Sequence, residues 1–390
     1  MTQTITLRNR VVADESTTAA LLSTLEAFAA GCNTINQMVS PKIRNRAKIH
    51  QQCYLLVRSK HGLSANLACR AIARVVGSRK AAGKKGYAVG KFQPTSVQYD
   101  ARIFSLQGEQ VSLTTVDGRK SIRLVLGIRD RALLATAPQP TSATLVLRKK
   151  ELWLHIQIQV ECVEPIAINQ VIGVDLGRTD IAVTSQGEYF SGSSVTKTRD
   201  HFSSVRASLQ TKASLGTVTR STRRRVRGLL QQLGGKEKKF STWYNHTVSR
   251  QIVNSALVSQ SALALEDLTG IRERVNRQPR SKVERRRSNS WAFYQLRQFI
   301  TYKALLAGVP LFLVPPAYTS QTCHACLHLG ERKAKSFVCL DPLCGWSGDA
   351  DYNGACTIAV IGAVVSQPGG PNLACVLSQV GFRATENPCL

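Results

Sequence analysis

Three acidic residues, each beside a strongly apolar segment, constrain this chain more than any other feature. Asp175 follows Val-Ile-Gly-Val, Glu266 follows Ala-Leu-Ala-Leu, and Asp351 precedes the apolar helix expected over 355–365. An acidic side chain on a buried strand is costly unless a cation neutralises it. Hard divalent ions such as Mg²⁺ take carboxylate ligands and commonly accompany phosphate groups. The pattern predicts that three carboxylates converge at the edge of one sheet, hold two ions about 4 Å apart and support phosphodiester hydrolysis.

Each of these acids also has a simpler interpretation. Asp175 and Glu266 fit carboxylates that are hydrogen-bonded at a strand end or turn, and Asp351 fits the N-cap of the following helix. Asp267 points to the opposite face of its strand from Glu266, since side chains alternate along a strand. Only one of these two can be a ligand, and periodicity alone does not choose between them. Asp349, two residues upstream, is an alternative to Asp351 as the third acid of the site.

Four cysteines lie shortly before the third acid. Cys323-His-Ala-Cys326 and Cys339-Leu-Asp-Pro-Leu-Cys344 have the spacing of a zinc ribbon. Four thiolates around zinc predict one closed, structural site. Two nearby histidines are alternative ligands that a complete cysteine set makes unnecessary: His324 and His328. The remaining cysteines lack such spacing and are expected to be ordinary side chains.

The chain is strongly basic. Its 52 Lys and Arg residues against 24 Asp and Glu residues give a net charge of +28, which predicts salt-sensitive attraction to a polyanion. Nucleic acid is the favoured partner; an anionic membrane surface is the alternative, but no long basic helix with a clean apolar face stands out. Two segments concentrate the charge, 197–239 and 272–287, and solvated surface is their simpler interpretation. The candidate phosphate-binding residues are Arg220, Arg223, Arg224, Arg225, Arg227, Arg285, Arg286 and Arg287.

No apolar stretch approaches the ~20 residues that cross a bilayer, and the N-terminal residues lack a signal pattern. We therefore expect a cytoplasmic protein, bacterial and nucleoid-associated, with reduced cysteines.

Hydrophobic periodicity divides the chain into segments of different character. A first strand and a later series of short β runs, among them one strand over 97–104, predict a β-barrel interrupted by a helical insert. We expect this barrel over 1–12 and 91–165, the insert over 13–90, an α/β domain over 166–317 and 347–365, the ribbon over 318–346 and a flexible tail over 366–390.

The order and spacing of these motifs resemble the TnpB family, transposon-encoded nucleases related to type V CRISPR effectors. The similarity is carried by Gly173-Val-Asp-Leu-Gly177, Leu265-Glu-Asp-Leu268, Phe293-Tyr-Gln-Leu-Arg297 with Tyr302-Lys303, Thr319-Ser-Gln-Thr-Cys323 with the ribbon, and Asp351-Tyr-Asn-Gly-Ala355. The similarity covers about residues 170–362. In the earlier part of the chain, only the order of the expected strands and helices is compatible with the family.

The resemblance implies a multidomain α/β fold. Its parts would be an RNase H-like (RuvC) nuclease domain with an inserted zinc ribbon, and an N-terminal wedge-type β-barrel with a helical recognition insert. It also implies RNA-guided, Mg²⁺-dependent DNA cleavage next to a short motif, with Asp175, Glu266 and Asp351 in the catalytic, magnesium-binding places. The implied cofactors are two Mg²⁺ ions, one Zn²⁺ ion and a guide RNA. The implied partners are double- and single-stranded target DNA but no membrane, for a monomer with one RNA.

Three departures from the family pattern affect details. The second cysteine pair is separated by four residues instead of two, so we expect a distorted second knuckle. Leu327 stands where Gly is usual, and the third acidic motif reads Asn353-Gly-Ala-Cys.

Two rival functions remain open at this stage: an RNA-guided DNA-binding regulator that does not cut, and a guide-free DNA nuclease or resolvase. A transposase that joins DNA is disfavoured because nothing resembles a nucleophilic Tyr with a paired-His motif.

Overall fold

The computed structural model describes residues 2–84, 88–177, 179–214, 219–268 and 293–366. The chain forms two compact units, Met1–Glu161 and Cys162–Leu390, and each is considered by itself.

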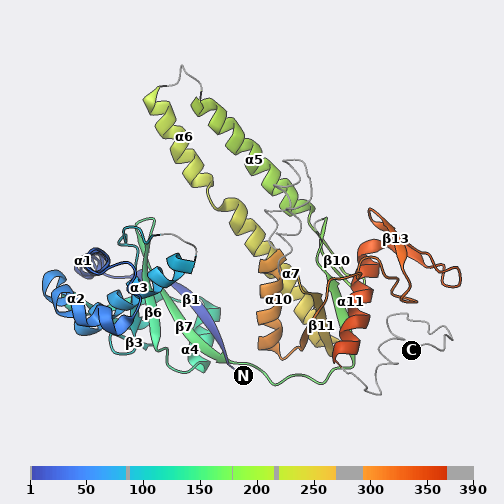
Figure 1. Ribbon diagram of the computed structural model, residues 1–390, viewed down its shortest axis with the longest axis horizontal. Coiled ribbons are helices and arrows are strands. Elements are labelled where there is room, and N and C mark those ends of the chain that lie inside the picture. Colours follow the sequence, from blue (N-terminus) through green and yellow to red (C-terminus); the bar gives the residue numbers. More distant parts are fainter. Residues whose placement is uncertain (1, 85–87, 178, 215–218, 269–292, 367–390) are drawn as a thin grey trace. The chain divides into compact units, whose positions relative to one another are not determined.

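The first unit is built on a seven-stranded antiparallel sheet in the order β2-β6-β7-β1-β5-β4-β3 (Figure 1). Its strands are β1 (Thr2–Val12), β2 (Ser96–Asp100), β3 (Phe104–Gln107), β4 (Gln110–Thr115), β5 (Gly118–Val125), β6 (Ser142–Arg148) and β7 (Glu151–Glu161). The two edge strands, β2 and β3, follow each other in the chain with only 101–103 between them. Because so short a connection brings the two edges together, the sheet curls into a nearly closed barrel.

The single strand predicted over 97–104 is wrong. The chain turns after Asp100, whose carbonyl accepts a hydrogen bond from the Ile103 amide at 3.0 Å and whose side chain accepts one from the Arg102 amide at 3.1 Å. An Asp side chain that bonds the backbone two residues later favours such a turn.

Three helices separate β1 from β2: α1 (Glu15–Met38), α2 (Arg46–His61) and α3 (Ala65–Lys84). Asp14 caps α1 by accepting a hydrogen bond from the Thr17 amide at 2.6 Å, and Asn45 caps α2. Phe28 of α1 and Tyr99 of β2 belong to one buried cluster, so helices and barrel share a core. A short helix that the periodicity did not predict, α4 (Ile128–Thr136), contributes no buried residue.

Arg79 of α3 is a buried cation with a structural role. Its guanidinium donates hydrogen bonds to the carbonyls of Val39, Ser40 and Ile43 at 2.7–3.0 Å. These carbonyls lie at and just beyond the end of α1, where helical backbone lacks partners, so the side chain ties α3 to the end of α1.

The second unit contains a five-stranded sheet in the order β10-β9-β8-β11-β12. β11 pairs in parallel with β8 and β12, whereas β9 pairs antiparallel with β8 and β10. The strands are β8 (Gln170–Asp175), β9 (Asp180–Thr184), β10 (Tyr189–Ser191), β11 (Ser261–Glu266) and β12 (Leu311–Val314). The helices are α5 (Ser193–Ser214), α6 (Arg220–Leu233), α7 (Lys236–Val258), α10 (Phe293–Ala307) and α11 (Ala350–Ser366).

Helices cover both faces of this sheet (Figure 1). Ile172 and Leu263 pack with α7 and α10 on one face, while Val171 and Ala264 pack with α11 on the other. Such two-sided burial explains the continuous apolar runs that precede the first two acids.

Small residues allow α11 to lie close to β8. A Cβ atom added to Gly173 would lie 2.0 Å from the carbonyl oxygen of Ala355 and 2.4 Å from the amide nitrogen of Ala359. Since both atoms are backbone, a side chain at this position would push the helix away from the strand.

A three-stranded antiparallel ribbon lies between β12 and α11 in the sequence. Its strands are β13 (Gly330–Lys333), β14 (Ser336–Cys339) and β15 (Ser347–Asp349). The helix after it begins at Ala350 and not at 355 as predicted, because Asp349 caps it.

The basic segment 197–239 is largely helical, with α5 and α6 forming a hairpin (Figure 1). The second basic segment, 272–287, and the tail after 366 lie outside the described residues. None of the described helices combines the length and apolarity needed to span a bilayer.

We predict that Gly173→Ala lowers the free energy of unfolding of the second unit by about 3 kcal/mol, because the new methyl group clashes with fixed backbone. Gly228→Ala is the matched control: this helical glycine has no neighbouring atom within 4 Å of an added Cβ. The control should raise stability by roughly 0.5–1 kcal/mol. Thermal unfolding followed by circular dichroism measures both, and equal stability of the two variants would refute the packing argument.

Candidate functional site

Asp175 and Glu266 end two neighbouring parallel strands. Val174 of β8 pairs with Leu265 of β11, so the next residue of each strand lies at the same level. The carboxyl ends of parallel strands meet at one edge of a sheet. The structure thus brings these two predicted site residues together.

Strand alternation and one ion pair decide between Glu266 and Asp267. Leu265 packs on the α7–α10 face and Ala264 on the α11 face, so Glu266 shares the α11 face. Asp267 points the other way and accepts a hydrogen bond from Arg297 at 2.6 Å. Glu266 is therefore the residue that shares a face with Asp175.

The third acid also comes to this edge. Asp351 lies in the first turn of α11 and is only 7% exposed. Its rival, Asp349, accepts hydrogen bonds from the amides of Asp351 and Tyr352 at 3.0 and 2.8 Å. The capping role therefore falls to Asp349, and the carboxylate of Asp351 is left for other partners.

The three acids influence one another electrostatically. Burial, together with the charges of Glu266 and Asp351, raises the pKa of Asp175 to about 7. Burial likewise raises the pKa of Glu266, although a hydrogen bond from Thr319 opposes this increase. Loss of hydration on burial is the main cause for both groups, and repulsion from neighbouring carboxylates adds to it at Asp175.

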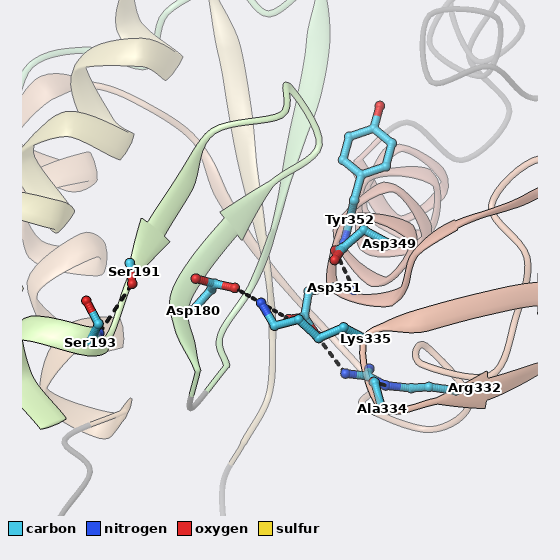
Figure 2. A network of polar contacts seen from close by, with 9 residues as sticks. All are labelled: Asp180, Ser191, Ser193, Arg332, Ala334, Lys335, Asp349, Asp351 and Tyr352. Carbon is cyan, nitrogen blue, oxygen red and sulfur yellow. Dashed lines mark hydrogen bonds and ion pairs between the residues drawn. The ribbon is translucent and has the colours of Figure 1, made fainter.

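Two cations that the sequence reasoning missed come from the ribbon hairpin (Figure 2). The Arg332 Nη2 atom lies 2.6 Å from Asp351 Oδ1. Lys335 forms an ion pair with Asp180, at the start of β9, and its Nζ atom lies 3.8 Å from Asp351 Oδ2. The hydrogen bond to Asp180 raises the pKa of Lys335, which keeps the ammonium charged. Both residues lie in a segment whose sequence signal is dominated by cysteines.

The carboxylates fit a divalent metal by their chemistry. Asp175, Glu266 and Asp351 supply only oxygen donors, which hard cations such as Mg²⁺ prefer. Asp175 and Glu266 keep part of their surface accessible. A divalent ion between them would remove the repulsion that raises the pKa of Asp175.

The four cysteines form a second candidate metal centre. Their sulfur atoms all lie within 4.8 Å of one another. The Sγ atoms of Cys323 and Cys344 are 3.9 Å apart, and those of Cys326 and Cys339 are 3.4 Å apart. Four sulfurs at 2.3 Å from a tetrahedral zinc ion would be about 3.8 Å apart. The cluster therefore fits zinc despite the unusual spacing of the second pair.

Neither histidine is needed to complete this set. Nδ1 of His324 lies 2.9 Å from Oδ1 of Asn353 in α11, and its ring is buried. His328 lies close to Cys326 and Asp341 and forms a 3.5 Å ion-pair contact with the latter. Four cysteines suffice for a closed zinc site, so His324 instead joins the ribbon to the helix that carries Asp351.

Leu327 adopts the left-handed backbone conformation of the turn after Cys326, and this conformation is unfavourable for a leucine. Its φ of 63° lies in the left-handed region, where Gly is favoured. The family's usual Gly at this position is thus replaced without loss of the turn.

The structure places the candidate phosphate-binding residues of α6 on the surface. Arg220, Arg223, Arg224, Arg225 and Arg227 are all exposed, while Val226 between them is buried. Residues 285–287 lie outside the described residues.

We predict that Asp175→Asn stabilises the protein when no Mg²⁺ is added, by roughly 2 kcal/mol, because a neutral amide replaces a buried carboxylate that lies near two other acids. Added Mg²⁺ should raise the melting temperature of the unmodified protein and not that of the variant. The exposed Asp117 offers a control, since Asp117→Asn removes the same charge elsewhere. A melting temperature lowered by Asp175→Asn would contradict a repulsive cluster.

We predict that Leu327→Gly tightens zinc binding about fivefold, because the left-handed turn then costs about 1 kcal/mol less. Competition with a chromophoric chelator measures this affinity. Leu343→Gly, at an exposed position between the last two cysteines that has no positive φ, is the control and should not tighten binding. Equal affinities for all three proteins would exclude strain at Leu327.

Comparison with known proteins was made by sequence and by fold. Residues 293–358 match the family model of the Cas12f1-like TNB domain. The CRISPR-associated endodeoxyribonuclease Cas12f1 of Sulfoacidibacillus thermotolerans is 30% identical over 226 residues, 55% of this chain and 51% of that protein. The TnpB-like protein MJ0751 of Methanocaldococcus jannaschii is 35% identical over 127 residues, 33% of this chain and 43% of that protein. The matched regions thus span about half of these relatives or less.

The fold is also similar to that of a solved structure. The cryo-EM structure of a Cas12f1–sgRNA–target DNA complex matches with a TM-score of 0.56 over 89% of this chain and 83% of that one, at 13% identity. The sequence comparison confirms the resemblance that the motifs indicate, and the fold agrees with it: this chain is similar to TnpB and Cas12f proteins.

Proposed function

We propose that this chain is an RNA-guided, Mg²⁺-dependent DNA endonuclease encoded by a transposable element. The observation that carries the proposal is the convergence of Asp175, Glu266 and Asp351 at one edge of the second unit's sheet. On this proposal, that sheet with its helices is an RNase H-like (RuvC) nuclease domain. The first unit is then a wedge-type barrel with a helical recognition insert.

The three carboxylates would hold two Mg²⁺ ions. When bound, such ions supply an activated water and stabilise the leaving oxygen of a phosphodiester. Asp175 and Glu266, fixed on adjacent strands, hold the oxygen ligands in place, and α11 brings Asp351 to them. Arg332 bonds Oδ1 of Asp351, whereas Oδ2 has only the longer contact of 3.8 Å with Lys335.

Nucleic-acid binding is supported by the surface charge of the α5–α6 hairpin. Four arginines of α6 follow the spacing i, i+3, i+4 and i+7, which places them on one face of the helix: Arg220, Arg223, Arg224 and Arg227. A band of guanidinium groups matches the phosphate groups of a nucleic-acid strand.

Guidance by RNA rests on the relatives. The solved Cas12f1 complex contains an sgRNA and target DNA, and the Sulfoacidibacillus relative is an endodeoxyribonuclease. In such proteins base pairing supplies sequence choice and the protein contributes contacts to the backbone.

The rival functions differ from this proposal in one feature each. A DNA-binding regulator has no use for three converging carboxylates, whose repulsion costs stability. A guide-free nuclease would require no RNA, so sequencing of the nucleic acid that co-purifies with the protein separates it from a guided enzyme.

We predict that Asp175→Ala abolishes DNA cleavage, with a loss of at least about a thousandfold, while the protein still binds its RNA. Plasmid cleavage with the co-purified RNA, alongside RNA binding by filter retention, measures both properties. Asp117→Ala is the control and should cut at the unmodified rate. Undiminished cutting by Asp175→Ala would refute the catalytic assignment.

A further inference from the structure

The hairpin of β13 and β14 carries a lysine at the acid cluster that is not needed to attach the hairpin to the rest of the unit. Lys335 contacts Asp180 and lies 3.8 Å from Asp351, and Figure 2 shows its side chain reaching between these two carboxylates. The hairpin is already attached at the same residue through its backbone, since the Ala350 amide donates to the Lys335 carbonyl at 2.8 Å. The ribbon is also held by Asn353, which contacts His324 and the carbonyl of Thr322.

Lys335 differs from its partners in exposure. Its side chain is 48% exposed, whereas those of Asp180 and Asp351 are 12% and 10% exposed. Arg332 lies between these values at 33%. Lys335 is therefore the most solvent-accessible member of this group of ion-paired side chains, and the one most open to contact from a substrate.

The charges of the cluster favour an anion at this place once metal is bound. The four carboxylates of Asp175, Glu266, Asp351 and Asp180 outnumber the two hairpin cations that contact them, Arg332 and Lys335. Two divalent ions would change this deficit of positive charge into an excess. A phosphate group near Lys335 would then balance the excess, because Lys binds phosphate as a compact point charge.

We propose that Lys335 binds a phosphate group of the nucleic-acid strand next to the bond that is cut, and that Asp180 is a positioning residue that holds Lys335 in place. The proposal rests on the nuclease function proposed above. It adds one specific substrate contact, made by the residue that precedes β14.

The test uses full-length protein with its co-purified RNA and compares three variants. Lys335→Ala removes the charge, and Lys335→Arg keeps it. Lys333→Ala is the matched control, because this lysine of the same hairpin is 78% exposed and pairs with Glu331. With DNA below saturation, Lys335→Ala should cut about tenfold more slowly, Lys335→Arg within about threefold of the unmodified rate, and Lys333→Ala within about twofold.

A binding measurement distinguishes a role of Lys335 in phosphate binding from a purely structural role. In the Asp175→Asn background, Lys335→Ala should lower the slope of log affinity for DNA against log salt by about one, and Lys333→Ala should not. Asp180→Asn should slow cutting about threefold with an unchanged salt slope, since the cation remains but loses its anchor.

Two results would overturn the proposal. In one, Lys335→Ala behaves as Lys333→Ala does in both assays. In the other, Lys335→Ala leaves the salt slope unchanged while it speeds zinc release and lowers the melting temperature, which identifies a structural tie. Failure of the unmodified protein to cut any DNA would instead refute the nuclease function, and the salt slope would still decide the role of Lys335.

Discussion

The burial of neighbouring carboxylates at one sheet edge is the constraint on which this structure depends. Burial and the neighbouring acids raise the pKa of Asp175 to about 7, so the cluster costs stability unless cations oppose it. The fold nevertheless brings the acids together, because Gly173 lets α11 lie directly against β8. Proteins keep such unfavourable arrangements mainly at functional sites.

The ribbon offers part of the compensation. It precedes α11 in the chain, and Asn353 joins it to that helix, so the hairpin lies beside the third acid. From there Arg332 and Lys335 reach Asp351. The position of the four-cysteine ribbon directly before the third acid thus has a physical consequence: its hairpin places two cations beside a cluster that lacks positive charge.

The sequence predicted those parts of the site that depend on local pattern. Acids at the ends of buried strands indicated Asp175 and Glu266, and cysteine spacing indicated the thiolate cluster; their catalytic and metal-binding roles stay predictions. The sequence did not predict features that depend on particular contacts within the folded chain. The choice of Glu266 over Asp267 needed the partner Arg297. The cap at Asp349, the turn at Asp100 that breaks a predicted strand, and the ion pairs of Lys335 also depend on contacts that periodicity does not encode.

The central claim is that Asp175, Glu266 and Asp351 together bind divalent metal. Crystals of the protein soaked in Mn²⁺, which replaces Mg²⁺ and scatters anomalously, test it most directly. The account predicts anomalous density in contact with carboxylate oxygens of all three residues, and none there in the Asp175→Asn protein. Density that appears only at other places, with these three side chains unmoved and without metal at saturating Mn²⁺, would contradict it.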